Sequence, residues 1–189
     1  MTAVGGALFP TEIGQCAVAW NALGICAVLL PEPSDAQTRK RLAARLGHHV
    51  QLDMQTGAPP PSVFAAIAAI QRLLAGGAAD LDFIALDMSG LPDFNTRVYA
   101  ITRRIAPGQT RTYGSIAREL ADVRLARAVG AALGRNPFPI IVPCHRVLGA
   151  DGSMTGFSAP GGVATKRRML EIEGVRQPVT GSLFDDDAS

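Results

Sequence analysis

A cysteine, a histidine and an arginine stand side by side at Cys144, His145 and Arg146, and together they could form an activated nucleophile. A free thiol has a pKa of about 8.5, so at neutral pH it is mostly protonated unless a neighbouring base or cation favours the thiolate. His145 and Arg146 supply one neighbour of each kind. The apolar residues 140–142 are typical of the end of a buried strand, however, and cysteine is among the most buried residue types. An inert core thiol is therefore the alternative interpretation.

Several separated motifs surround this cysteine. They are, in chain order, Thr-Tyr-Gly-Ser-Ile-Ala at 112–117, Ala-Arg-Ala-Val-Gly at 126–130, Asn-Pro at 136–137, a Gly-rich loop at 156–162 and Glu-Ile-Glu-Gly at 171–174. Their order and spacing resemble the O6-alkylguanine-DNA alkyltransferase family (methylated-DNA–protein-cysteine methyltransferases) over about residues 91–177. The resemblance implies a DNA-repair protein that moves an alkyl group from the O6 atom of guanine to its own cysteine.

The chemistry that the resemblance implies begins at the thiol. Cys144 attacks the alkyl carbon, His145 takes the thiol proton through an ordered water, and Glu173 orients and charges the imidazole. Glu171 is the neighbouring carboxylate, but the residue directly before the glycine matches the family pattern. Both acids could instead only cap the last helix, although carboxylates are unfavourable at a helix C-terminus. The thioether product has no second thiol or cofactor to reverse it, so we expect one turnover per molecule and no cofactor.

A modified base must leave the helical stack before it can react, at a cost of a few kcal/mol. By the resemblance, Arg127 fills the vacated space and pairs with the orphaned base. Tyr113 presses on the flanking phosphate and can donate its hydroxyl proton to the leaving guanine, and Asn136 ties the recognition helix to the active-site segment. Without the motif context, Tyr113 would be an ordinary half-buried aromatic residue and Asn136 a turn residue.

Small residues dominate the helix expected over 126–133, with Arg127 standing out among them. Close helix packing in a core would explain such residues in an arbitrary sequence. In the family, by contrast, this helix enters the DNA minor groove, where small side chains fit a narrow trough. The resemblance assigns DNA contacts to Tyr113, Ser115, Ala126, Arg127, Ala128, Gly130 and Arg135. It assigns the substrate pocket to Val142, Pro143, Met154, Phe157 and Ser158.

The loop after Phe157 carries two residues, Ala159 and Pro160, more than the shorter versions of the family. This loop would shape the pocket, with Ser158 as the most favoured side-chain contact. Because its length differs, larger O6-alkyl groups or O4-alkylthymine are possible further substrates.

The elements that must position these residues can be read from periodicity. Residues 7–31 alternate around turn signals and predict a hairpin or meander, and 81–88 predicts a further strand. Helices are expected over 34–46, with Ser34 or Asp35 as N-cap, and over 63–74. Beyond residues 89–92, which are typical of a linker, helical periods dominate. Short helices at 115–120, with Ser115 as N-cap, and 126–133 flank a turn and form a helix-turn-helix pattern.

Two domains are the expected organisation, in a mixed α/β (α+β) fold. The resemblance implies an RNase H-like α/β domain over 1–89. A mostly helical, winged helix-turn-helix-like domain over 90–177 would carry DNA binding and catalysis, and the acidic tail 178–189 is expected to be disordered.

Charge is unevenly distributed along the chain, although the formal net charge is only +2. Residues 1–90 carry 5 basic and 7 acidic side chains, whereas residues 91–177 carry 13 basic and 6 acidic ones. A basic, arginine-rich C-terminal half suits phosphate neutralisation, although solvated helix faces would give the same pattern.

The remaining composition narrows the class of protein. Hydrophobic residues make up 48% of the chain, which suits a globular rather than a disordered protein, and no apolar run is long enough to span a bilayer. Residues 1–10 lack a basic segment before a long apolar stretch, so no signal peptide is expected. We therefore expect a cytoplasmic monomer without membrane contact. Cys16 and Cys26 are expected to be small core residues, and no metal site is expected, because His48, His49 and His145 show no zinc spacing with the cysteines.

Three rival functions remain open at this point. A non-repairing protein that binds alkylated DNA would lack the reactive cysteine, which this chain has. A transcription regulator would need side chains that read base edges in the major groove, and a cysteine hydrolase would need an oxyanion hole. The preferred partner is double-stranded DNA containing O6-alkylguanine.

Overall fold

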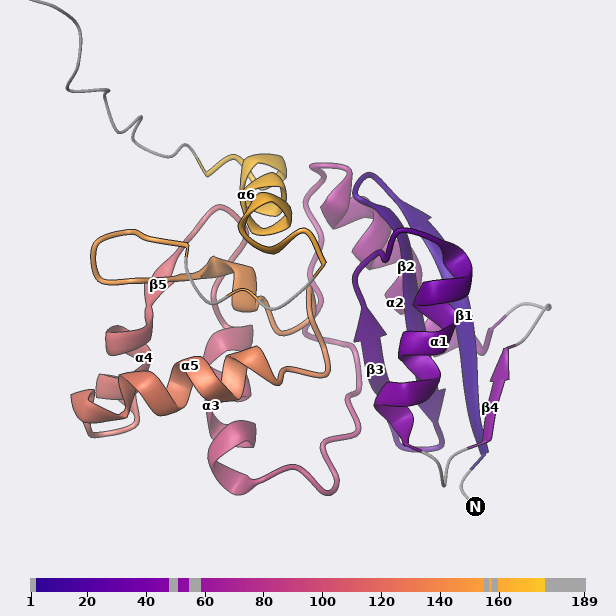
Figure 1. The fold of residues 1–189 in the computed structure, drawn as a ribbon, viewed down its shortest axis with the longest axis horizontal. Coiled ribbons are helices and arrows are strands. Elements are labelled where there is room, and N and C mark those ends of the chain that lie inside the picture. The colour runs from indigo at the N-terminus through magenta and orange to yellow at the C-terminus, as the bar shows by residue number, and fades with distance from the viewer. Residues whose placement is uncertain (1–2, 48–50, 55–58, 155–156, 158–159, 176–189) are drawn as a thin grey trace, which may run out of the picture.

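The computed structural model describes residues 3–47, 51–54, 59–154, 157 and 160–175, and it has a mixed α/β architecture (Figure 1). A four-stranded sheet is built first along the chain, from β1 (Ala3–Thr11), β2 (Gly14–Asn21), β3 (Gly24–Leu29) and β4 (Gln51–Met54). The strand order is β3-β2-β1-β4. The first three strands pair antiparallel, which confirms the predicted hairpin or meander, whereas β4 pairs in parallel with β1.

Alternating residues along β2 face two different helices. Cys16, Val18 and Trp20 belong to the larger core cluster, to which helix α2 (Pro61–Leu74) contributes Ile70 and Leu74 among others. The residues between them, including Ala17 and Ala19, pack instead with Leu42 of helix α1 (Asp35–Leu46). The two helices thus cover opposite faces of the sheet (Figure 1). The predicted cap of α1 is confirmed, because the Ser34 hydroxyl accepts a hydrogen bond from the Gln37 N–H at 3.3 Å.

The remainder of the described chain is mostly helical. It contains α3 (Asp93–Arg103), α4 (Tyr113–Glu119), α5 (Ala126–Gly134) and α6 (Gly162–Ile172), with the short parallel pair β5 (Arg111–Thr112) and β6 (Val147–Leu148). A 3-10 turn, Val123–Leu125, joins α4 to α5 where the turn was predicted. The N-cap prediction for α4 was wrong: Thr112 is the cap, since its hydroxyl accepts from the Ser115 N–H at 3.1 Å.

The strand predicted over 81–88 does not form. Only an isolated bridge joins Leu86 to Ile25. The Arg103 guanidinium donates hydrogen bonds to the Leu81 carbonyl at 2.7 Å and to the Ile84 carbonyl at 2.8 Å, which a neighbouring strand would otherwise bind. Gly24 fits this close approach, because a Cβ atom there would lie 2.5 Å from the Ala85 carbonyl oxygen. Leu81 and Ile84 are therefore buried without a strand ladder, because the Arg103 side chain binds their carbonyls and the Ile25 N–H binds that of Ala85.

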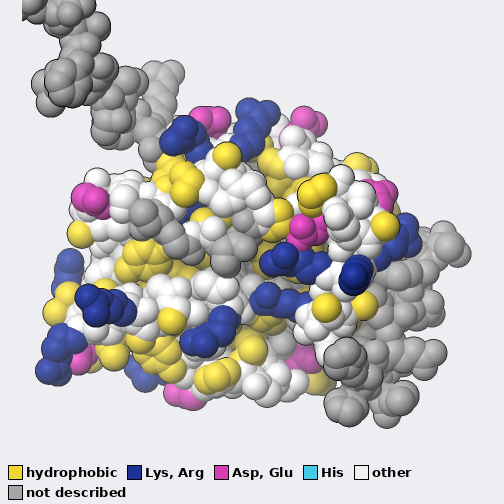
Figure 2. All heavy atoms as spheres, in the orientation of Figure 1, with side chains coloured by type: hydrophobic (Ala, Val, Ile, Leu, Met, Phe, Trp, Pro, Cys, Tyr) yellow, Lys and Arg dark blue, Asp and Glu magenta, His cyan; other side chains and the backbone are white. Residues whose placement is uncertain are grey.

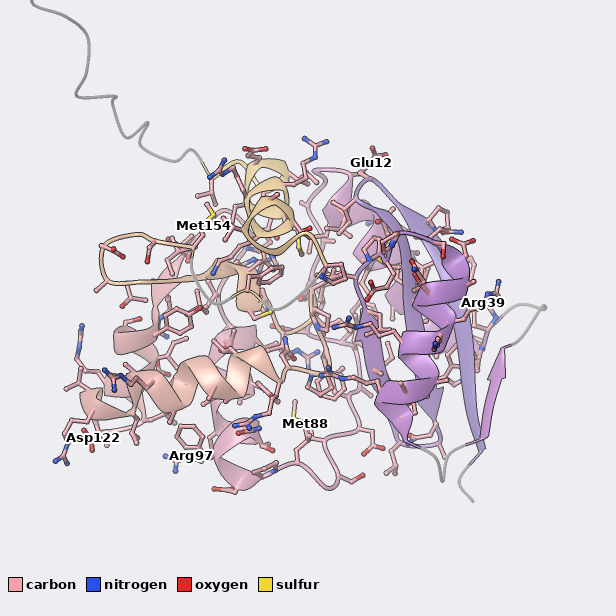
Figure 3. All side chains as sticks on the ribbon, in the orientation of Figure 1. Glu12, Arg39, Met88, Arg97, Asp122 and Met154 are labelled. Atoms are coloured by element: carbon pink, nitrogen blue, oxygen red, sulfur yellow. The ribbon has the colours of Figure 1, made fainter. Side chains whose placement is uncertain are left out.

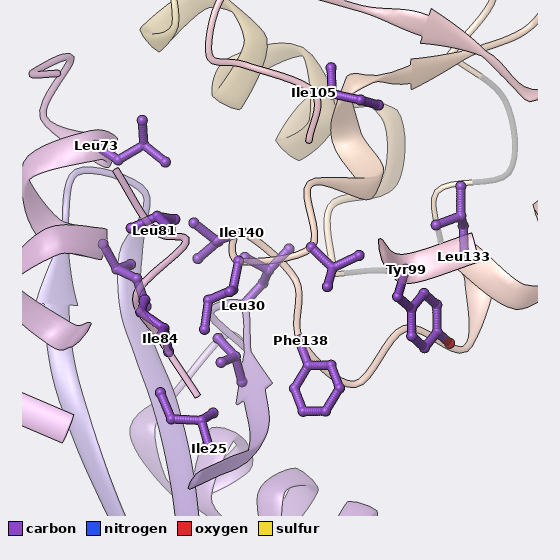
Figure 4. Close-up of a cluster of buried hydrophobic side chains, with 14 of the residues drawn as sticks. Ile25, Leu30, Leu73, Leu81, Ile84, Tyr99, Ile105, Leu133, Phe138 and Ile140 are labelled. Carbon is purple, nitrogen blue, oxygen red and sulfur yellow. The ribbon is translucent and has the colours of Figure 1, made fainter. Parts of the chain in front are cut away.

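The apolar stretch before Cys144 is also not a strand. Ile140 has a φ of 76°, and the Val142 N–H donates to the Phe138 carbonyl at 2.8 Å, so the chain turns here. Ile140 and Phe138 are fully buried in one core cluster with residues of the sheet and of α3 and α5. Ile25 and Leu30 lie on the sheet side of this cluster (Figure 4). The segment that leads to Cys144 is thus fixed by hydrophobic burial from both sides.

None of the helices in the described ranges has both the length and the apolar composition needed to cross a bilayer. The predicted acidic tail, 178–189, lies outside the described residues.

Candidate active site

Cys144 opens a short 3-10 turn, Cys144–Arg146, directly after the buried apolar segment. Its side chain is partly exposed to a cavity of about 70 Å³, which Tyr113, Asn136 and Phe157 also line. Burial raises the pKa of the Cys144 thiol, while a hydrogen bond with Asn136 and the positive charge of Lys166 act in the opposite direction. The resting thiol is therefore protonated at neutral pH, and it needs a base and a stabilising charge to react.

His145 and Glu173 form a buried pair behind this turn. The imidazole Nε2 lies 3.0 Å from the Glu173 carboxylate Oε1, and both side chains are 1% exposed. Burial lowers the pKa of His145 despite the pull of Glu173, so the ring is neutral and Nε2 donates to the carboxylate. Nδ1 is then the acceptor, and it is buried without a hydrogen-bond partner among the described residues. The ring is thus oriented as a base with a free lone pair.

Arg146 has a different task from the one that its place beside the thiol suggested. Its guanidinium donates twice to Glu173, from Nε to Oε2 at 2.8 Å and from Nη2 to Oε1 at 2.7 Å, and Nη1 donates to the Ile105 carbonyl. Although burial opposes it, the bonds from His145 and Arg146 lower the pKa of Glu173 to about 2. Arg146 therefore fixes the carboxylate as an anion and does not act as the thiol's own cation.

Lys166 is the functional candidate that the sequence analysis missed. Its side chain is fully buried, and Nζ donates to the Val147 carbonyl and lies 5.9 Å from the ring centroids of both Tyr113 and Phe157. Burial lowers the pKa of Lys166 to about 8. One signal could have revealed it: Lys166 stands three and four residues before Met169 and Leu170, on the apolar face of α6.

Asn136 is buried at the end of the segment that follows α5. Its Nδ2 donates to the Val142 carbonyl at 2.8 Å, and its Oδ1 accepts from the Phe138 N–H at 2.9 Å. One side chain thus spans the turn that leads from α5 to Cys144.

Tyr113 is the first residue of α4, and burial raises the pKa of its phenol. A Cβ atom at Gly130 of α5 would lie 3.8 Å from its ring, which is an ordinary van der Waals distance, so the ring packs against this part of α5. Ser115 makes local bonds, from its hydroxyl to the Thr112 carbonyl and from Arg111 Nε to its hydroxyl.

Helix α5 presents small residues to solvent. Arg127, Ala128, Ala131, Gly134 and Arg135 are exposed, Ala126 and Gly130 are partly exposed, and Val129, Ala132 and Leu133 are buried. Core packing therefore explains the buried three but not the exposed small residues. Lys and Arg side chains are scattered over the face that α4 and α5 share and continue toward α1 (Figure 2).

The predicted pocket residues are only partly brought together. Phe157 lines the cavity with Cys144, whereas Val142, Pro143 and Met154 are buried outside its lining; Met154 lies in the loop on the α6 side (Figure 3). Ser158 lies outside the described residues. The sheet side contributes wall residues that the sequence analysis did not name, among them Leu30 and Arg45.

Cys16 and Cys26 lie in β2 and β3 and are not among the residues that line the Cys144 cavity. Cys16 is buried as predicted, and Cys26 is half-buried; burial raises their pKa values to about 12 and about 11. Among the residues that the structure describes, which omit His48 and His49, no group of three His, Cys, Asp or Glu side chains could hold a metal ion.

The chain is similar to known methylated-DNA–protein-cysteine methyltransferases. A family model described as the DNA-binding domain of 6-O-methylguanine DNA methyltransferase matches residues 93–175. A curated methylated-DNA–protein-cysteine methyltransferase of Mycobacterium tuberculosis is 44% identical over 128 residues, or 67% of this chain and 75% of that protein. The corresponding protein of Methanothermobacter thermautotrophicus is 38% identical over 117 residues, or 62% of this chain and 64% of that protein.

Solved structures share the mixed α/β fold over most of the chain. The crystal structure of the Mycobacterium tuberculosis O6-methylguanine methyltransferase superimposes with a TM-score of 0.71 at 34% identity, covering 93% of this chain and 96% of that chain. The structure of the same organism's OGT in complex with DNA gives a TM-score of 0.69 at 33% identity, covering 89% and 92%.

Proposed function

The chain belongs to the methylated-DNA–protein-cysteine methyltransferase family, and we propose that it repairs duplex DNA by taking the alkyl group of an O6-alkylguanine onto Cys144. One observation carries the proposal: Cys144 is partly exposed in a cavity whose lining includes Tyr113 and Asn136, and the next residue, His145, forms a buried pair with Glu173. The alternative of a non-repairing damage-binding protein would leave this cavity without a nucleophile, so we do not favour it.

The proposed reaction starts from the protonated thiol. Neutral His145 takes the proton of Cys144 through a bridging water, because its Nδ1 has no direct partner among the described residues. Glu173, with its pKa of about 2, remains an anion that stabilises the resulting imidazolium. The sulfur then attacks the alkyl carbon; the S–C bond forms as the C–O6 bond breaks. Guanine leaves with that electron pair and takes up a proton, for which the Tyr113 hydroxyl is the proposed donor.

Lys166 is proposed to stabilise the thiolate while it forms. Its ammonium group is buried, and its charge acts on Cys144. At a low-dielectric site a cation beside a thiolate is worth more than in water. His145 would therefore remove the proton, and Lys166 would lower the energy of the charge left behind.

Lys166→Met should slow alkyl transfer at pH 7 by about tenfold, which corresponds to one pKa unit of thiolate stabilisation. Because the pKa of Lys166 is about 8, its positive charge fades above that pH, so the rate of the native protein should stop rising there. The rate of the variant should keep rising as the thiol ionises. Single-turnover rates between pH 6 and 10 check this, with exposed Arg167→Met as control; identical pH profiles would exclude the role.

DNA binding is proposed for the exposed face of α5, with Ala126, Ala128 and Gly130 against the minor groove. Arg127 would occupy the space of the flipped base, and Tyr113 would press on the flanking phosphate. Further contacts of Ser115 and Arg135 with the DNA complete the proposed interface. The resting position of Arg127 supports this role, since it is exposed on the small-residue face of α5.

Arg127→Ala should slow transfer from duplex DNA by about tenfold or more, with little change in thermal unfolding because Arg127 is exposed. Single-stranded DNA needs no base replacement, so the defect should shrink on a single strand of the same sequence. The ratio of the two rates is the measurement, with Arg168→Ala of α6 as a matched exposed control. An unchanged ratio would argue against base replacement by Arg127.

We also propose that the chain folds as two domains. The strand order β3-β2-β1-β4 supports an RNase H-like domain over 1–89, and α4, α5 and the pair β5-β6 support a winged helix-turn-helix-like domain over 90–177. We further propose a monomer without a cofactor, with Val142, Pro143, Met154 and Ser158 supporting the pocket around Phe157.

A further inference from the structure

The segment 135–137 connects the exposed helix α5 to the turn that carries Cys144, and the sheet side of the molecule holds it at two points. The Arg45 guanidinium Nη2 donates to the Arg135 carbonyl at 2.8 Å. The Val28 N–H, on the outer edge of β3, donates to the Pro137 carbonyl at 2.8 Å. Asn136 between them bonds in the opposite direction, to Val142 and Phe138. Hydrogen bonds therefore fix the segment 135–137 both to the sheet side and to the turn that leads to Cys144.

Arg45 also completes the C-terminal end of α5. The last carbonyls of a helix lack partners within the helix and carry partial negative charge, so a cation is favourable there. The last turn of α5 holds no basic residue of its own. Tyr99 donates to the Ala132 carbonyl at 2.9 Å, and Arg45 of α1 places its guanidinium on the carbonyl of the C-cap residue Arg135. Two other helices thus cap α5.

The position of Arg45 sets it apart from the other arginines of α1. It lines both the cavity at Cys144 and a second cavity of about 610 Å³ between the sheet and the helical part. Arg41 lines only the first of these and pairs with Glu32 at 2.9 Å, and Arg39 points outward from the same helix (Figure 3). Among these three, Arg45 is the one whose hydrogen bond reaches the segment between α5 and Cys144.

We propose that Arg45 is a positioning residue for alkyl transfer: it fixes the C-terminal end of α5 to α1, so that the DNA-facing helix and the Cys144 turn keep their relative position. The inference rests on the proposed function, and it gives the sheet part of the chain a share in the reaction. Docking of α5 on DNA would then deliver the base to a thiol at a set distance. Without the Arg45 bond, the segment 135–137 would move more freely, and productive alignment would be rarer.

The test compares Arg45→Ala and Arg45→Lys with Arg39→Ala as control. Single-turnover transfer from a duplex containing one O6-methylguanine is measured over a range of protein concentrations, which separates the maximal rate from the half-saturating concentration. We expect Arg45→Ala to lower the maximal rate about tenfold with less than a twofold change in half-saturation, because a charged hydrogen bond is lost. Arg45→Lys, which can still donate to the carbonyl, should recover most of the rate.

Hydrogen exchange gives a readout that does not depend on activity. In Arg45→Ala, the amides of Asn136, Phe138 and Val142, all hydrogen-bonded within this turn, should exchange about tenfold faster than in the Arg39→Ala control.

Two results would overturn the proposal. Equal maximal rates and equal exchange in Arg45→Ala and Arg39→Ala would show that the bond positions nothing. A weaker half-saturation with an unchanged maximal rate would make Arg45 a simple phosphate contact. A native protein that never becomes methylated would refute the proposed function instead, so the two failures are distinguishable.

Discussion

Cys144→Ala is expected to abolish alkyl transfer while the protein still binds a duplex containing O6-methylguanine. The sulfur is the atom that forms the new bond, and no other described group in the cavity lining is a thiol, so the rate should fall below detection, by at least about 10⁴-fold. The proposed DNA-binding surface is the exposed face of α5, which the substitution does not touch. Methyl loss from the DNA and mobility-shift binding are measured on the same preparation.

Cys26→Ala is the matched control for this substitution. Its thiol is half-buried in β3, and its pKa is raised to about 11, so it should remain unreactive and its loss should leave transfer unchanged. A Cys144→Ala protein that still removes the methyl group would contradict the assignment, and so would an inactive Cys26→Ala protein that folds normally.

Glu173→Gln is expected to have the second-largest effect, because it removes one anion that serves two partners. His145 loses the negative charge that stabilises its protonated form, because the amide oxygen of glutamine can still accept a hydrogen bond but carries no charge. Transfer should therefore fall by about 10²-fold or more. Arg146 keeps its charge in a buried site without a counter-ion, which costs about 3–5 kcal/mol of stability. Rates should therefore be compared at a temperature where circular dichroism shows the variant folded.

The ion pair of Glu173 should also make the stability of the protein depend on pH. The pKa of Glu173 falls from 4.5 to about 2 on folding, which corresponds to about 3 kcal/mol. This stabilisation is complete above the unfolded value and is lost as the pH falls from about 4.5 toward 2. Urea unfolding across that range should show the loss in the native protein and in Glu171→Gln, whose side chain is exposed, but not in Glu173→Gln. Equal acid profiles for all three proteins would contradict the ion-pair account.

The sequence motifs correctly predicted the pair His145–Glu173, although the two residues are 28 positions apart along the chain. Glu173 was chosen over Glu171 by its place before a glycine, and in the structure it is the one that lies 3.0 Å from His145. What no local pattern could reveal is that Arg146 points to the same carboxylate. That contact depends on how α6 packs against the turn of Cys144, and the two residues are 27 positions apart.

Two errors in the fold prediction share one physical cause, which is that side chains replaced backbone partners. Residues 81–88 have the composition of a strand, but Arg103 binds their carbonyls, and this bond comes from a helix more than fifteen positions away. The segment before Cys144 has apolar residues that suit a strand equally well, yet it turns at Ile140 under the control of Asn136. Strand β4 has only four residues, too few for a periodic signal.

The sequence also does not show which of the small residues of α5 are buried and which are exposed. Small residues of α5 divide into an exposed face with Ala128 and a buried face with Ala132, which only the packing of the helix decides. Lys166 is followed directly by two exposed arginines, and only its spacing of three and four residues to the buried Met169 and Leu170 indicates that it points inward.

Intact-protein mass after incubation with a duplex containing one O6-methylguanine, followed by peptide mapping, tests the central claim most directly. The account predicts a gain of one methyl group, located on Cys144 and saturating at one per protein molecule. A protein that binds the duplex but gains no mass, or one that carries the methyl group on another residue, would contradict it.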